Sequence, residues 1–110
     1  MKMSFVLPLL LAGFAAFAQD VMPRMSSVEP GSGKIGDVVA VAGENLDKAN
    51  VAKVYLTNGK DDFECEITGQ SATEIKLKIP AKATGRLALM ILTGGKEPKY
   101  IEQPVRVTVE

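Results

Sequence analysis

Residues 27–46, SVEPGSGKIGDVVAVAGENL, carry the clearest strand and turn signals of the chain. A turn rich in proline and glycine, residues 30–36, leads into the valine- and alanine-containing segment 38–42, which stops at Gly43. Valine favours strands, whereas glycine and proline mark turns. The stretch therefore predicts a strand that is entered and left through tight turns.

The first eighteen residues have the pattern of a secretory signal peptide. Lys2 gives a positive start, residues 5–17 are almost wholly apolar, and an Ala-Phe-Ala sequence ends at Ala18. A membrane-spanning helix needs about 20 apolar residues, more than this run supplies. We therefore expect cleavage after Ala18, which divides the chain into a signal peptide, 1–18, and one domain, 19–110, exported to the periplasm or the cell exterior.

The composition argues against several classes of function. The chain has 13 basic and 13 acidic residues, without the basic surplus of nucleic-acid-binding proteins. It has no histidine, so a His-based catalytic triad is impossible, and its single cysteine, Cys65, cannot form an internal disulfide. We expect no catalytic residue, no metal and no cofactor. We also expect no nucleic acid as a partner and no stable membrane insertion.

The rest of the chain alternates between short strands and turns. The pattern predicts seven strands, at residues 25–28, 38–42, 52–57, 63–68, 74–79, 85–93 and 100–109. The second is apolar on both faces, which predicts little solvent on either side. Pro104 cannot donate to a ladder and should lie at an edge or a bulge. So many short strands in one small chain predict an all-β, antiparallel sandwich.

The fourth and fifth predicted strands alternate in opposite phase, so a register can be predicted. Folding the hairpin about Ser71 places Glu66 opposite Lys76 and Ile67 opposite Ile75. This register pairs opposite charges on one face and apolar side chains on the other. Cys65 shares the inward phase with Ile67, which predicts a buried thiol.

These motifs closely resemble the IPT/TIG family of immunoglobulin-like domains. The family opens with a hydrophobic-x-Pro-x-x-Gly-x-x-Gly-x-x-Val-x-Val-x-Gly-x-Asn-aromatic/Leu pattern. It is matched here by Pro30, Gly33, Gly36, Val39, Val41, Gly43 and Leu46. Residues 73–80 and 85–95 resemble later family motifs, so the likeness covers about residues 22–109. The resemblance implies an immunoglobulin-like sandwich of about seven strands. It also implies a non-catalytic function, either as a binding module or as a structural module.

Two further features have a simple and a functional interpretation. The acidic residues are Asp61, Asp62, Glu64 and Glu66. They could bind a calcium ion, but calcium needs six to eight converging oxygen ligands. A solvated turn explains the acidic cluster without a metal. On the strand at 85–93, Leu89 and Ile91 in the core would leave Met90 and Leu92 facing outward.

That outward phase predicts an interaction face. In an immunoglobulin-like sandwich, the strand at 85–93 lies between the third and the last predicted strands. Its outer face would gather Tyr55, Met90, Leu92 and Arg106, an apolar patch beside charge of the kind that marks binding sites. The alternative is a strand buried on both faces.

The leading functional hypothesis is therefore a bacterial exported module that binds another envelope or extracellular protein. The alternative is a carbohydrate-binding accessory domain with a polysaccharide as its partner. Sugar recognition favours an aromatic platform, and the domain at 19–110 has only Tyr55, Phe63 and Tyr100 to build one.

Overall fold

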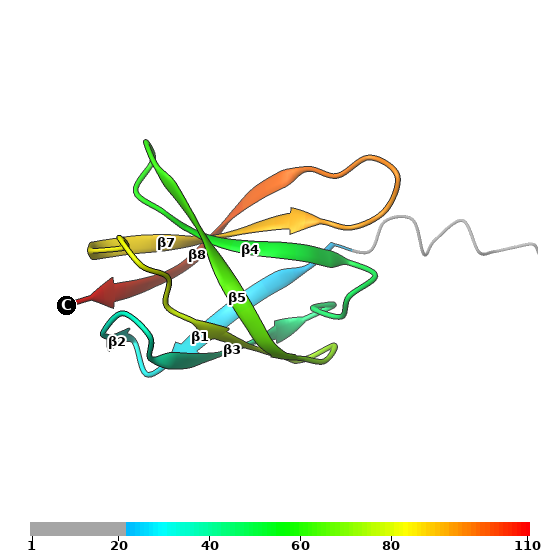
Figure 1. Cartoon of the computed structure of the whole chain (residues 1–110). Coiled ribbons are helices and arrows are strands. Elements are labelled where there is room, and N and C mark those ends of the chain that lie inside the picture. The colour runs from blue at the N-terminus through cyan, green and yellow to red at the C-terminus, as the bar shows by residue number, and fades with distance from the viewer. Residues whose placement is uncertain (1–21) are drawn as a thin grey trace, which may run out of the picture.

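The computed structural model describes residues 22–110, and its regular elements are all strands (Figure 1). They are β1 (Arg24–Glu29), β2 (Ser32–Gly33), β3 (Val38–Glu44), β4 (Val51–Thr57), β5 (Asp62–Gln70), β6 (Glu74–Lys78), β7 (Gly85–Thr93) and β8 (Tyr100–Val109). The seven predicted strands are confirmed, and the all-β, immunoglobulin-like fold with them. The predicted signal peptide, 1–18, lies outside the described residues. Within those residues, no helix is long and apolar enough to cross a membrane.

The strands form two sheets that share β5. One sheet has the order β1-β3-β6-β5, and the other has the order β5-β4-β7-β8-β2. Residues 62–65 of β5 pair with β4, whereas pairing with β6 begins at Glu66. Figure 1 shows β5 crossing between the two layers. A single strand thus holds one margin of the sandwich together.

One pair of strands departs from the predicted antiparallel arrangement. β2, inside the turn rich in proline and glycine, pairs in parallel with the end of β8. The Thr108 N–H donates to the Gly31 carbonyl oxygen, and the Glu110 N–H donates to the Gly33 carbonyl oxygen, both at 2.9 Å. The turn can offer these carbonyls because it runs alongside the last strand.

β3 is buried on one face only, so the prediction of a strand shielded on both faces is wrong. Val39 and Val41 point into the core, whereas Val38 is 49% exposed and Ala42 is also exposed. The reason is that the fold has only two sheets, so β3 has the other sheet on one face and solvent on the other. Apolar composition alone cannot distinguish this arrangement from full burial.

The predicted β5–β6 register is also wrong, by two residues up to Ile67 and by three beyond it. Glu66 lies opposite Lys78, and Ile67 lies opposite Leu77. A bulge between Ile67 and Gly69 shifts the pairing, and the turn is tight because the Ser71 N–H donates to the Glu74 carbonyl oxygen at 2.8 Å. A shift of two residues keeps every side chain on its face, so the predicted inward and outward phases still hold.

The core between the sheets is almost entirely aliphatic, and its two buried polar side chains have partners. Gln103 Oε1 accepts a hydrogen bond from the Met25 N–H at 2.8 Å, which ties β8 to β1 at the margin opposite β5. Thr57 Oγ1 accepts one from the Gly59 N–H at 3.1 Å. Pro104 lies in the irregular stretch where β8 bulges against β7, which confirms the prediction for this residue.

Candidate interaction face

The outer face of β4, β7 and β8 brings together three of the four residues predicted for an interaction face. Tyr55 of β4 lies opposite Met90 of β7. Leu92, two positions along β7, lies opposite Tyr100 of β8. The intervening Ile91 is fully buried in the core. Strand alternation therefore holds Tyr55, Met90 and Leu92 on one surface.

Arg106, the fourth predicted residue, lies on the same sheet but farther along it. It is exposed and lies opposite Ala88, and the bulge in β8 separates it from Glu102, the residue opposite Met90. Ala88 shares the outward phase of Met90 and Leu92, but it is only 4% exposed. Thr57, opposite Ala88, is equally buried, so the accessible apolar surface ends before it reaches Arg106.

Tyr100 is a member of this face that the sequence reasoning missed. The rings of Tyr55 and Tyr100 lie 5.8 Å apart between centroids, tilted by 54°. The two residues come from the strands on either side of β7, so their rings lean toward each other over that strand. Tyr100 is 62% exposed, while Met90 and Leu92 are only partly exposed. The alternation of β8, followed back from Arg106, would have found it.

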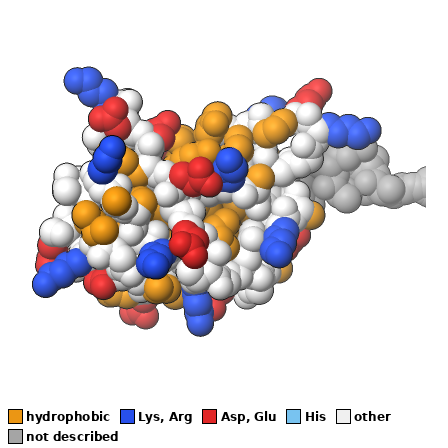
Figure 2. Space-filling view, viewed as in Figure 1, with side chains coloured by type: hydrophobic (Ala, Val, Ile, Leu, Met, Phe, Trp, Pro, Cys, Tyr) orange, Lys and Arg blue, Asp and Glu red, His pale blue; other side chains and the backbone are white. Residues whose placement is uncertain are grey.

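Charged groups border the tyrosine pair. Lys53 Nζ lies 3.9 Å from Glu64 Oε1, and both side chains are about half exposed, so this ion pair contributes little to stability. Burial raises the pKa of the Tyr55 hydroxyl, and the neighbouring Tyr100 hydroxyl and Glu64 carboxylate raise it further. Tyr55 therefore keeps its proton and can donate a hydrogen bond at neutral pH. In Figure 2, apolar side chains reach the surface in small groups among charged ones.

The acidic residues after β4 begin in an exposed turn at Asp61 and continue along β5, which carries Asp62, Glu64 and Glu66. Asn58 Oδ1 accepts hydrogen bonds from the Lys60 N–H at 2.8 Å and the Asp61 N–H at 2.7 Å. Asp61, Asp62 and Glu64 are exposed. Across residues 22–110, no group of three or more acidic or cysteine side chains is placed to hold a metal ion.

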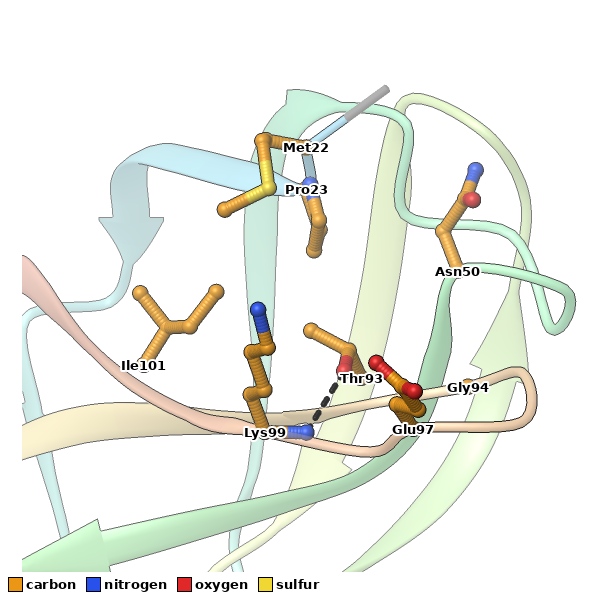
Figure 3. A pocket seen from close by; sticks show the side chains of 8 residues that line it. All are labelled: Met22, Pro23, Asn50, Thr93, Gly94, Glu97, Lys99 and Ile101. Atoms are coloured by element: carbon orange, nitrogen blue, oxygen red, sulfur yellow. Dashed lines mark hydrogen bonds between the residues drawn. The ribbon is translucent and has the colours of Figure 1, made fainter. Parts of the chain in front are cut away.

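A second surface feature lies at the end of the sandwich where the described chain begins (Figure 3). It is a pocket of about 190 Å³ between the start of β1 and the β7–β8 loop. Figure 3 shows the Lys99 side chain extending between Ile101 and Thr93, and the Lys99 N–H donates to Thr93 Oγ1 at 2.8 Å. Among the polar side chains that line the pocket, Glu97 and Lys99 are exposed and Asn50 and Thr93 are partly exposed, so none of them is a buried polar group.

Cys65 is buried, as predicted, with 4% of its surface exposed. Burial raises the pKa of its thiol from 9.0 to about 12. Because the thiolate is the reactive form, we expect a thiol reagent to label Cys65 slowly in the native protein and rapidly in denaturant at neutral pH. Labelling followed by mass spectrometry measures both rates. Equal rates would contradict the buried position.

The raised pKa also has a consequence for stability. The unfolded chain loses the Cys65 proton near the ordinary thiol pKa, whereas the folded chain keeps it until about pH 12. The contribution of this group is therefore complete below pH 9 and is lost as the pH rises toward 12. A Cys65→Ala variant should show a smaller loss of stability over that interval than the parent protein.

Comparison with known proteins identifies the family. A family model of the IPT/TIG domain matches residues 23–109, nearly all of the described chain. The chain belongs to the IPT/TIG family. A comparison with curated protein sequences found no match. The family fits the glycines and valines of residues 27–46, which build the turn and the inward face of β3.

Solved structures that share the fold of this IPT/TIG domain include three Bacteroides proteins. A protein of unknown function from Bacteroides thetaiotaomicron VPI-5482 is 22% identical, with a TM-score of 0.69 over 83% of this chain and 22% of that one. An auxiliary nutrient binding protein from the same strain is 24% identical, with a TM-score of 0.60 over 83% of this chain and 21% of that one.

The third is SGBP-B of the Bacteroides ovatus mixed-linkage glucan utilization locus, solved with a mixed-linkage heptasaccharide. It is 24% identical, with a TM-score of 0.51 over 73% of this chain and 21% of that one. At these identities the likeness shows the fold alone. This IPT/TIG domain spans about a fifth of the length of each of these proteins.

Proposed function

We propose that this IPT/TIG domain is an exported, non-catalytic module that binds another envelope or extracellular protein through the outer face of β4, β7 and β8. One observation carries the proposal: Tyr55, Met90, Leu92 and Tyr100 adjoin on a face that the core does not use. Tyrosine is enriched at binding hot spots and methionine at interfaces generally. Export is supported by the signal-peptide pattern of residues 1–18.

The arrangement of this face suits a protein partner. Tyrosine rings give a large apolar contact area, and their hydroxyls can still form hydrogen bonds at the edge of an interface. Lys53, Glu64 and Glu102 provide a charged rim of both signs around the rings. An apolar centre within a polar rim is the usual organisation of a protein interface.

Met90→Glu is expected to leave the domain folded and to weaken partner binding by about 1–2 kcal/mol or more, because a charge would enter the centre of the interface. A pull-down from the native envelope, with mass spectrometry, identifies the partner, and titration measures its affinity. Circular dichroism checks the fold. Ser27→Glu, which adds the same charge to an exposed position on the other sheet, is the matched control.

Two results would reject this face as the site. If Met90→Glu unfolds the domain, β7 has no free outer face. If the variant folds and binds its partner as tightly as Ser27→Glu does, the partner contacts another surface.

Carbohydrate binding is the second candidate, and the tyrosine pair favours it. The apolar C–H face of a sugar ring packs on an aromatic ring, and hydroxyl and charged groups such as Lys53 and Glu64 can bind its hydroxyls. Calorimetric titration with a mixed-linkage glucan heptasaccharide tests this function. Saturable binding that Tyr100→Ala abolishes would support it, and no binding at millimolar sugar would leave the protein partner as the better candidate.

The non-catalytic part of the proposal is supported by Cys65. Its thiol is the strongest nucleophile among the side chains of the domain, yet it is buried and keeps its proton at neutral pH. Turnover of any substrate by the purified domain would contradict the proposal.

A further inference from the structure

β5 changes partners along its length, and the change leaves part of one edge without a neighbour. Residues 62–65 pair with β4, and pairing with β6 begins only where Glu66 lies opposite Lys78. Beyond Lys78, the chain turns to the β2–β3 connection. The Ile79 N–H donates to the Asp37 carbonyl oxygen at 2.8 Å, and the Ile79 carbonyl oxygen accepts from the Gly36 N–H at 3.0 Å. Within the described chain, residues 62–65 therefore have a strand neighbour on one side only.

A groove of about 360 Å³ lies beside this free edge. Glu64 and Glu66 of β5 line it, together with Ile35, Pro80 and Ala81 from the connections that flank β2 and β6. Ile35 is 48% exposed, although it is a large aliphatic side chain. The groove thus combines apolar walls with a backbone edge that can still form hydrogen bonds.

The charges of the groove select the kind of partner. Its lining carries two carboxylates, Glu64 and Glu66, against the single ammonium group of Lys78. Asp61 and Asp62 precede them on the chain and are also exposed. The surplus of negative charge along β5 complements a cationic ligand.

The two faces of β5 differ in chemistry, and this difference also restricts which peptide can bind. Glu64 and Glu66 point outward, whereas Phe63 points inward and is only half buried, packed against the rim of the core. Successive side chains of a strand point to opposite faces. A strand added to this edge would therefore place every second residue near Glu64, with Glu66 just beyond the free segment, and the residues between them near Phe63.

We propose that the free edge of β5 at residues 62–65 is a strand-addition site for an extended segment of another protein in which basic and apolar residues alternate. Exposed sheet edges offer unpaired N–H and C=O groups, and extended peptides bind them through main-chain hydrogen bonds with side-chain pockets providing specificity. The site shares Glu64 with the rim of the tyrosine face. The two proposals are still tested independently, because Glu66 and Ile35 line the groove only, whereas Met90 and Tyr100 belong to the tyrosine face only.

The test uses a labelled peptide of about eight residues in which lysine and valine alternate, a length that spans a typical strand. Fluorescence anisotropy should show saturable binding. The same peptide with alternate backbone nitrogens methylated should not bind, because it cannot complete the ladder. On addition of the parent peptide, the amides of residues 62–65 that point away from β4 should exchange hydrogen more slowly.

Variants of the protein locate the site. Glu66→Lys should weaken binding of the peptide at least about tenfold, since it opposes like charges. Ile35→Ser removes an exposed apolar side chain from the groove lining and should also weaken binding of the peptide. Glu74→Lys makes the same charge change on an exposed residue at the far end of β6 and should alter the affinity less than about twofold.

Three results would overturn the proposal. The first is no binding of the parent peptide at millimolar concentration. The second is equal binding of the methylated peptide, which would mean that the backbone edge takes no part. The third is an equal loss of affinity in Glu66→Lys and Glu74→Lys, which would indicate diffuse electrostatic attraction.

Discussion

Val41→Asp is expected to unfold the domain. Val41 is fully buried at the centre of β3, opposite Val28 of β1 and Ile75 of β6. A carboxylate at this position would lie among aliphatic side chains without a hydrogen-bond partner, at a cost of several kcal/mol. The whole stability of a domain is only about 5–15 kcal/mol, so this loss would leave little or no folded protein at ambient temperature.

Thermal unfolding followed by circular dichroism measures the effect. Val38→Asp is the matched control, because it makes the same substitution on the same strand at a position that is exposed and lies opposite Lys78. Its free energy of unfolding should change by about 0.5 kcal/mol or less. Similar melting temperatures for the two variants would show that the inward phase of β3 is wrong.

Gly43→Ala should have the second-largest effect. A Cβ on Gly43 would collide with the carbonyl oxygen of Arg24 and come within 2.9 Å of the Met25 Cα, both of them backbone atoms of β1. Backbone cannot rotate away as a flexible side chain can, so β1 would have to move from β3. Overpacking costs about 1–3 kcal/mol, and this contact should lie at the upper end or above it.

Urea unfolding gives the stability change for Gly43→Ala. The control is Gly31→Ala, since a Cβ on Gly31 meets no atom within 4 Å. That variant should stay within about 0.5 kcal/mol of the parent protein. A loss of less than about 1 kcal/mol in Gly43→Ala would show that β1 adapts to a side chain at this position.

The interaction face was predictable in part. The alternation of β7, together with the place of that strand in a sandwich, was enough to predict from the sequence that Tyr55, Met90 and Leu92 share one surface. The accessible extent of the patch was not predictable. Ala88 is buried on the outer face, and Tyr100 leans across β7 toward Tyr55, because neighbouring strands decide what covers each position.

The family, the seven main strands and the inward and outward phases of the alternating strands could be read from the amino-acid sequence. Those properties follow from local turn residues and from the two-residue period of a strand. The β5–β6 register, the passage of β5 between sheets and the close approach of Gly43 to β1 were decided by the tertiary structure. A two-residue shift leaves the inward and outward pattern unchanged, so only contacts between distant segments can select among registers.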